Sequence, residues 1–352
     1  MIDRGELLRK LILNAIRFSL LAPLASRYYS GVGAILMLHR VNVAPLTTIG
    51  ANRHLTVTPG FLDELLTEVK RLGFEFVSMD ETVERLSSGR RGGRYVTITA
   101  DDAYRDNLVE ALPVLEAHDA PMTIYVAPGL TEGNVFLWWE LLEEVVSRRP
   151  TVYLKTPEGR MVFECASKAE KFRANAEIHD YLTEKIAEED QLDVVRELAW
   201  SSGLDPRELG KKALLDWDEL RGMVAHPLIT IGAHTVHHYN LRRLSEEKAR
   251  REITEAAGIL EMELGEKPRH LAYPYGYDAA VGAREVRLAR EAGYASAVTT
   301  RHGLLQAEHA AHLHALPRIS INGRYQCVKH VGTMLSGITT PIANRGRRVV
   351  TV

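Results

Sequence analysis

Short apolar runs alternate with longer amphipathic segments along most of this chain. Segments with helical periodicity, notably 61–73, 107–118 and 245–265, lie between several of the apolar runs. The runs that we interpret as strands are 33–41, 74–78, 95–100, 121–129, 228–234, 269–276, 294–300 and 316–320. Repeated alternation of strands and helices predicts an α/β fold whose strands are mainly parallel.

Local signals place some element boundaries. Thr58 followed by Pro59 is typical of a helix start, and so is Asp216 followed three residues later by Glu219. Pro113 lies inside the segment 107–118 and must kink the helix or mark its boundary. In the strand 95–100 we expect Val96, Ile98 and Ala100 to share one side.

The stretch 133–212 interrupts this alternation. It is charged and mostly helical, with an expected β-hairpin at 151–164. Neither a Ser/Gly-rich linker nor a repeat flanks it, so we interpret it as a helical insertion within one domain at 33–325. Residues 1–32 then form an N-terminal amphipathic segment and 326–352 a C-terminal tail. The N-terminal segment either packs on the domain or rests on a membrane face, and we prefer packing.

Charge and cysteine usage narrow the class of protein. The net charge is −2, with 44 basic and 46 acidic residues, so nothing indicates a nucleic-acid partner. Cys165 and Cys327 are far apart in the sequence, and we expect free thiols in a reducing compartment. We therefore expect a cytoplasmic protein; peripheral association with the inner membrane is the alternative that the N-terminal segment leaves open.

Two adjacent carboxylates follow the strand 95–100. Asp101 and Asp102 stand where functional groups collect in parallel α/β folds, although a turn or a helix cap would also favour aspartate. Two buried carboxylates repel each other. A cation would offset that repulsion, and one aspartate could then bind it while the other stays free to take a proton.

Histidines follow another strand. His234 and His238 are four residues apart, so on a helical turn they would share a face, and His237 would point elsewhere. Such a pair is a weak signal alone, and a surface cluster of histidines is the alternative. With one aspartate they supply three ligands and leave open positions, which is typical of a catalytic metal site.

A third strand ends in the stretch 270–278, which is rich in Tyr, Pro and Gly. It is either a turn with aromatic packing or a pocket wall that includes Pro274. In the second case a backbone N–H near Tyr275 could bind a developing oxyanion. His39, which ends the first strand, either lines the same site or serves as a core or capping residue.

The three stretches together resemble, in order and spacing, the polysaccharide deacetylases, whose shared region is the NodB homology domain (carbohydrate esterase family four). "TADDAYRDN" looks like the family's Thr-Phe-Asp-Asp-Gly motif, "HTVHH" matches its His-Thr-x-x-His motif, and "YPYG" resembles its Pro-Tyr-Gly motif. The resemblance implies a distorted (β/α) barrel of about seven strands. It also implies a divalent metal ion, usually zinc, held by Asp102, His234 and His238, with Asp101 as general base and Tyr275 at the oxyanion hole.

The chain departs from the family pattern at several positions. Ala100 replaces the usual Phe and Ala103 the usual Gly, and the arginine that many members carry near Ala272 is missing. The later Asp-Trp motif is not recognisable. The family's late catalytic histidine is also unclear, because His312 and His314 precede the last strand instead of following it.

The sequence therefore predicts a metal-dependent hydrolase that removes acetyl groups from an N-acetylated sugar, oligosaccharide or polysaccharide. The alternatives are a carbohydrate-binding protein of the same fold that has lost turnover, and a deacylase for another acyl group. Trp138 and Trp139, at the start of the insertion, either anchor it on the barrel or stack on a sugar ring.

Overall fold

A closed barrel of parallel strands forms the centre of the molecule. The computed structural model of the chain describes residues 10–11, 13–16, 26, 28–43, 49–89, 92–156 and 159–352. In order around the barrel, the seven strands are β1 (Gly33–Leu38), β12 (Leu316–Ser320), β11 (Ser296–His302), β10 (His270–Ala272), β9 (Ile229–Ala233), β6 (Met122–Val126) and β5 (Tyr95–Asp101). Pairing of β1 with β5 closes the ring, so the predicted seven-stranded (β/α) barrel is confirmed.

Residue alternation along β5 decides which side chains enter the barrel. Val96, Ile98 and Ala100 pack in the large apolar cluster between the strands and the surrounding helices, as the sequence predicted. Successive side chains of a strand point to opposite faces, so Thr97, Thr99 and Asp101 point into the barrel. The short strand β4 (Glu75–Phe76) pairs with the beginning of β5.

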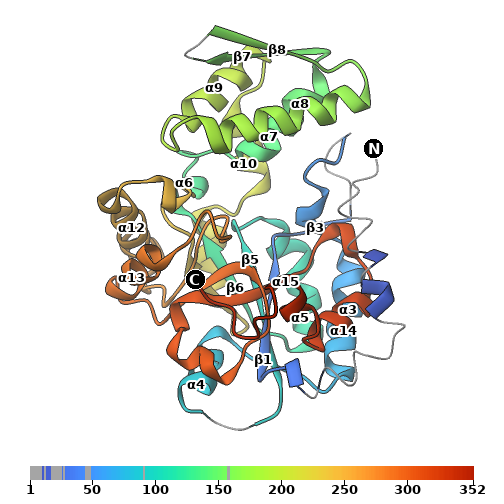
Figure 1. Ribbon diagram of the computed structural model, residues 1–352. Helices are drawn as coiled ribbons and strands as arrows, with labels where there is room; N and C mark the ends of the chain where they lie inside the picture. Colours follow the sequence, from blue (N-terminus) through green and yellow to red (C-terminus); the bar gives the residue numbers. More distant parts are fainter. Residues whose placement is uncertain are drawn as a thin grey trace.

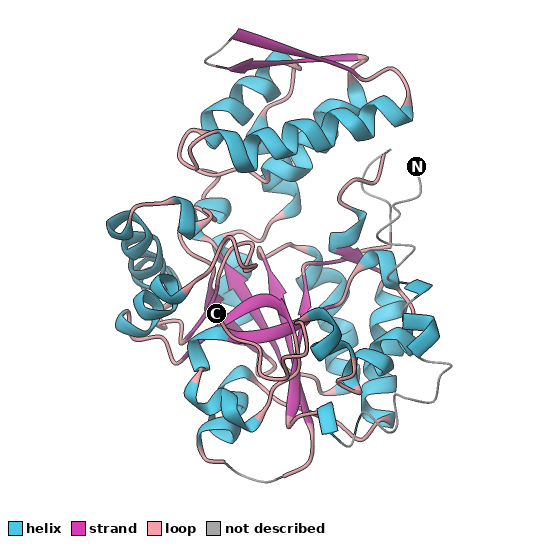
Figure 2. Ribbon diagram, in the orientation of Figure 1, coloured by secondary structure: helices cyan, strands magenta, loops and turns pink. Residues whose placement is uncertain are grey.

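Helices surround the barrel on its outside (Figures 1 and 2). They are α3 (Pro59–Arg71), α4 (Met79–Ser87), α5 (Leu112–His118), α6 (Pro128–Thr131), α11 (Trp217–Val224), α12 (Glu246–Leu264), α13 (Ala283–Glu291), α14 (Val328–Leu335) and α15 (Thr339–Ala343). A two-stranded ribbon of β2 (Arg40–Val41) and β3 (Thr56–Val57) lies beside the barrel.

The predicted helix boundaries have clear physical causes. The Thr58 side chain accepts a hydrogen bond from the Phe61 N–H at the start of α3, and Asp216 and Glu219 form a capping box at α11. Pro113 lies in the first turn of α5, where a missing N–H costs nothing, and a π-helical turn over Asn107–Ala111 precedes it.

The segment between α6 and α11 projects beyond one end of the barrel (Figure 1). It contains α7 (Trp138–Arg148), the antiparallel hairpin of β7 (Thr151–Thr156) and β8 (Gly159–Glu164), α8 (Lys168–Asp180), α9 (Gln191–Ser201) and α10 (Pro206–Ala213). These elements enclose a hydrophobic cluster of their own, which includes Leu142, Val145 and Ile178. We call residues 133–212 the insert; they leave and re-enter at the end of the barrel where β5, β6 and β9 finish.

Most of the N-terminal segment lies outside the described residues, so its predicted amphipathic character stays a prediction. Of its described residues, Ile16 is buried and Asn14 hydrogen-bonds His330 of α14 at 3.0 Å. Residues 326–352 carry α14 and α15, and Val350 is buried. Among the described helices, none combines the length and apolar character that crossing a bilayer requires.

Candidate metal centre and active site

Asp102, His234 and His238 come together at the carboxyl end of the barrel. Asp102 directly follows β5, and the two histidines follow β9, two strands away. The Nε2 atoms of His234 and His238 lie 3.6 Å and 3.3 Å from Asp102 Oδ1. One ligand atom from each residue lies within 4.8 Å of the others, so the three predicted ligands do converge.

The chemistry of these side chains fits a divalent metal ion. Asp102 Oδ1 is buried and has no hydrogen-bond partner among the described residues, which is costly for a carboxylate oxygen unless a cation faces it. His234 Nδ1 donates a hydrogen bond of 2.7 Å to the Ala272 carbonyl, which leaves Nε2 free as a ligand atom. Burial lowers the pKa of both histidines, so both are neutral at pH 7, the form that binds a metal.

The predicted ligands His234 and His238 do not share a helical face as the sequence suggested. Residues 234–238 form an irregular loop, in which Thr235 and His238 have positive φ angles of 60° and 57°. Glu252 of α12 holds this loop by accepting hydrogen bonds from the Val236 and His237 N–H groups at 3.0 and 2.8 Å. His237 Nδ1 also contacts Glu252 at 2.6 Å, so this histidine points away from the site, as predicted.

Asp101 is held by a fully buried arginine inside the barrel. Two hydrogen bonds of 2.7 Å join the Arg318 guanidinium to the two carboxylate oxygens of Asp101. Burial opposes ionisation of Asp101, but the charge and hydrogen bonds of Arg318 outweigh it and keep the pKa of Asp101 below its usual range. Asp101 is therefore ionised at neutral pH and fixed in orientation.

Sequence reasoning missed Arg318. It lies in β12 two residues after Leu316, whose side chain packs inside the barrel, so the arginine side chain must also point inward. The available signal was a charged residue in the middle of an apolar strand, since a buried charge requires a partner. No feature of the sequence alone indicated that the partner was Asp101.

The loop after β10 brings Tyr275 to the site. Its ring centroid lies 5.2 Å from that of His238, and its backbone φ is 62°. The Tyr275 N–H has no acceptor among the described residues, while Thr300 holds the Tyr275 carbonyl at 2.6 Å. Gly276 follows with φ of 60°, and a Cβ there would stand 2.5 Å from the Thr300 nitrogen, so only glycine fits. Pro274 is buried behind this turn.

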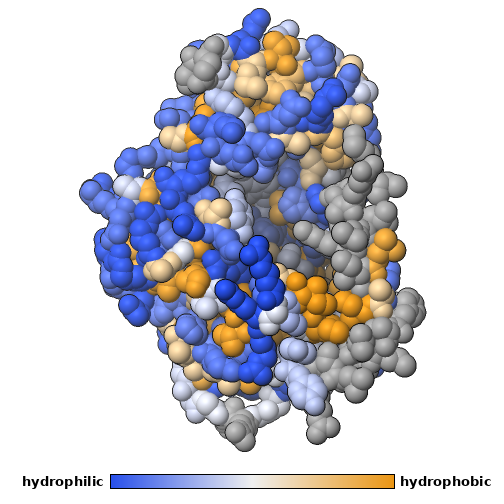
Figure 3. All heavy atoms as spheres, in the orientation of Figure 1, coloured by the Kyte–Doolittle hydropathy of each residue, from blue (hydrophilic) through white to orange (hydrophobic). Residues whose placement is uncertain are grey.

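Three further predicted site residues lie near the group formed by Asp102, His234 and His238. His39 follows β1, and burial lowers its pKa to about 4, an effect that the negative charge of Asp101 partly opposes. Trp139 lies with its ring centroid 5.1 Å from that of His238. Trp138 is only 5% exposed and donates a hydrogen bond of 3.3 Å to the Tyr275 hydroxyl. Figure 3 shows the surface hollowed between the insert and the barrel on this face of the molecule.

A family model described as polysaccharide deacetylase matches residues 88–297. This range includes the three predicted ligands and Asp101. The chain belongs to the polysaccharide deacetylase family. No curated protein sequence matches the chain.

Solved structures of deacetylases share the fold. Deacetylase PplD of Streptococcus pyogenes, determined with acetate, has a TM-score of 0.54 at 22% identity, with 82% of this chain and 92% of that chain covered. IcaB of Ammonifex degensii has a TM-score of 0.53 at 16% identity, with 87% and 97% covered. A de-N-acetylase of Aggregatibacter actinomycetemcomitans has a TM-score of 0.54 at 12% identity, with 86% and 99% covered.

Two departures from the family pattern have structural explanations. The chain has no arginine near Ala272, but Arg318 reaches the Asp101 carboxylate from a different strand, β12. Ala103 occupies the place of the usual glycine with φ of 53°, so the turn keeps its left-handed conformation despite the side chain. The Ala272 carbonyl in turn orients His234.

His314 does not reach the site. Its Nε2 donates a hydrogen bond of 2.7 Å to the carbonyl of Tyr294, which precedes β11. His314 itself comes just before β12. Both positions lie at the amino ends of the parallel strands, whereas Asp101 and the metal group lie at the carboxyl ends. His314 therefore cannot be the catalytic acid.

The left-handed backbone at Ala103 gives a stability prediction. A left-handed alanine costs about 1–2 kcal/mol, and glycine removes that strain but adds about 0.4–1 kcal/mol of chain entropy to the unfolded state. We expect Ala103→Gly to be neutral or to raise the free energy of unfolding by up to about 1.5 kcal/mol. Ala100→Gly, in the ordinary strand β5, is the control and should lower it. Urea unfolding measures both; equal destabilisation by the two changes would contradict the prediction.

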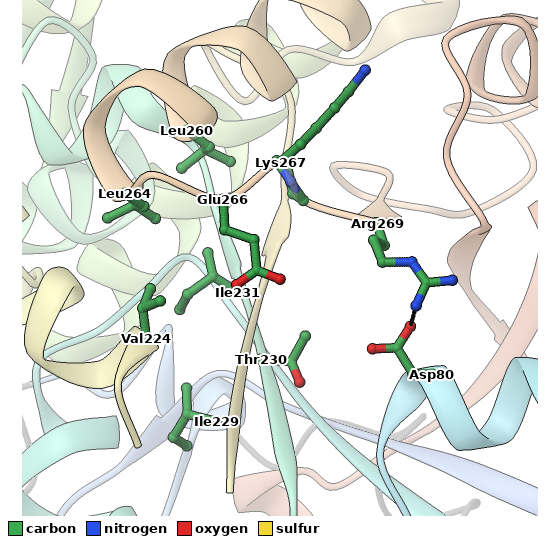
Figure 4. Close-up of a pocket in the computed structure, with 11 residues that line it drawn as sticks. Asp80, Val224, Ile229, Thr230, Ile231, Leu260, Leu264, Glu266, Lys267 and Arg269 are labelled. Carbon is green, nitrogen blue, oxygen red and sulfur yellow. Dashed lines mark hydrogen bonds and ion pairs between the residues drawn. The ribbon is translucent and has the colours of Figure 1, made fainter. Parts of the chain in front are cut away.

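A second hollow lies at the opposite end of the barrel (Figure 4). Apolar side chains of β9, α11 and α12 line it, and the ion pair between Asp80 and Arg269 borders it. It contains no group of metal-ligand residues among the described part of the chain. The converging Asp102, His234 and His238 side chains lie at the carboxyl end of the barrel, away from this hollow.

Proposed function

We propose that this chain is a metal-dependent N-deacetylase, which removes acetyl groups from an N-acetylated sugar, oligosaccharide or polysaccharide. One observation carries the proposal: the Asp102–His234–His238 group lies beside an ionised, arginine-held Asp101 at the carboxyl end of a deacetylase-family barrel. We propose zinc as the metal, since two imidazoles and one carboxylate suit it and leave positions open for substrate and water.

Asp101 would act as the general base. Its carboxylate is ionised and cannot rotate away because Arg318 binds both oxygens. It can therefore accept the proton of a water molecule as that water attacks the acetamide carbon. A bound divalent ion would supply Lewis-acid polarisation of the acetamide carbonyl and lower the pKa of the water.

Tyr275 and His39 would handle the substrate. The Tyr275 N–H, for which the described residues offer no acceptor, can donate a hydrogen bond to the carbonyl oxygen as negative charge develops on it. His39 is neutral at pH 7, because its pKa is lowered to about 4, and so offers one donor and one acceptor to sugar hydroxyl groups. Contact of Trp138 or Trp139 with a sugar ring stays a prediction, although the burial of Trp138 favours an anchoring role.

The alternative of a binding protein without turnover rested on the altered positions 100, 103 and 272. The structure weakens that argument, because Arg318 supplies the missing arginine and Ala103 keeps the turn. The proposed base, metal ligands and oxyanion donor thus lie close together, which supports turnover, and the proposal assigns no general acid. Turnover is the function that this arrangement supports best.

Acetate release measures the function directly. We expect the purified chain to release acetate from N-acetylglucosamine oligomers, to stop after chelation, and to recover when Zn²⁺ is restored. An O-acetylated oligomer of equal length is the matched substrate and should react more slowly. Metal binding without acetate release from either substrate would support the binding protein, and preference for the O-acetyl compound would support a deacylase of another kind.

A further inference from the structure

The first turn of α7, which belongs to the insert, contacts three barrel loops at the active site. Trp138 donates a hydrogen bond to Tyr275 at 3.3 Å, and Trp139 donates one to the Tyr104 hydroxyl at 3.0 Å. Glu140 accepts one from Arg40 at 2.8 Å. Each of the three partners follows a different barrel strand, β10, β5 or β1. Three consecutive residues of the insert thus bind three loops that carry active-site groups.

The contacts of Trp139 and Tyr104 bear on two of the metal ligands. The Trp139 ring packs against His238, with centroids 5.1 Å apart and an angle of 46° between the planes. Tyr275 packs against His238 as well, at 5.2 Å. Tyr104 is fully buried and follows Asp102 by two residues, so its hydroxyl anchors the loop that carries that ligand.

Buried charges reinforce this contact between insert and barrel. The Arg40 guanidinium lies 4.5 Å above the Tyr104 ring and also binds Asp106 at 2.8 Å. Arg40, Asp106 and Glu140 are each less than a tenth exposed. Charges buried in this way are costly to separate, so the first turn of α7 is held firmly against the barrel.

Backbone strain explains why the ligands need such support. Asp102 and His238 have φ angles of 71° and 57°, and a left-handed non-glycine residue costs about 1–2 kcal/mol. Strained residues persist only where the surrounding structure over-determines them. For Asp102 and His238, part of that surrounding structure is the insert.

We propose that Trp139 and Tyr104 are positioning residues for the metal ligands, through which the insert completes the metal site. The inference rests on the proposed metal site. It differs from simple anchoring, in which these two residues would stabilise the fold without changing metal affinity. The hydrogen bond between Trp139 Nε1 and the Tyr104 hydroxyl is the contact to test.

Two variants remove this hydrogen bond: Tyr104→Phe deletes only the hydroxyl group, and Trp139→Phe replaces the indole with a smaller aromatic ring that has no N–H donor. Trp139→Phe and Tyr104→Phe should each weaken Zn²⁺ binding to the full-length protein by about 10-fold, the lower end of the range for outer partners of metal ligands. The double variant should lose less than the two single losses combined, because both changes delete the hydrogen bond between Trp139 and Tyr104. Trp200→Phe and Tyr153→Phe are matched controls in the insert, at side chains 60% and 48% exposed.

Zinc affinity is measured by competition with a chromophoric chelator, and the absorption spectrum of the Co²⁺-substituted protein reports ligand geometry. Thermal unfolding of the metal-free variants checks that each is folded; Tyr104→Phe, which deletes one oxygen, remains usable if Trp139→Phe unfolds. If the variants bind zinc as tightly as the two controls, even with lower stability, the positioning role is wrong and the proposed function still stands. If the wild-type protein binds no zinc, the proposed function fails together with it.

Discussion

The Asp101→Asn variant should deacetylate an N-acetylglucosamine oligomer at least about 100-fold more slowly than the wild-type chain, the usual minimum for losing a general base. It should keep its metal, because the carboxylate of Asp101 binds Arg318 and is not one of the three converging ligands. Acetate release and metal content of the same preparation measure the two effects. Asp102→Asn is the neighbouring control, and its main effect should be weaker metal binding.

Loss of Asp101 also leaves the buried Arg318 charge without its partner, which typically destabilises a protein by about 3–5 kcal/mol. A second variant separates this effect from the chemistry. Asp101→Asn combined with Arg318→Gln removes the unpaired charge and should recover stability without recovering turnover. If the double variant regains activity, or if both aspartate variants lose metal equally, Asp101 is not the base.

The His234→Ala variant should bind zinc more weakly by a larger factor than the roughly 10–100-fold that loss of an outer partner causes. The variant loses one of three proposed ligands, so only Asp102 and His238 can still bind the ion. The hydrogen bond between His234 and the Ala272 carbonyl is lost with the side chain. Acetate release should fall with metal occupancy. Metal analysis after dialysis and chelator competition provide the measurements.

His237→Ala is the matched control, since it changes a histidine of the same loop that contacts Glu252 instead of Asp102. Glu252 still holds the Val236 and His237 N–H groups in that variant, so the loop keeps its main support. We expect zinc affinity close to that of the wild-type chain. Equal zinc affinity in His234→Ala and wild type would show that the proposed ligand set is wrong.

Much of the candidate site was predictable because its residues follow strands. Asp102, His234, His238 and Tyr275 all lie just beyond apolar runs, and parallel strands bring such positions to one end of a barrel. The conformation of the histidine loop was not predictable. A spacing of four residues is compatible with a helical turn, and contacts with Glu252 on the following helix, α12, hold the irregular loop instead.

By itself the sequence determined the alternation of strands and helices, the caps at Thr58 and Asp216, and the positions of the paired aspartates and histidines. These features depend on neighbours within a few residues, so local patterns are sufficient to reveal them. Only the tertiary structure decided that Arg318 holds Asp101 and that Trp139 reaches Tyr104 and His238. Those partners are far apart in the chain, and barrel closure and the packing of the insert bring them together.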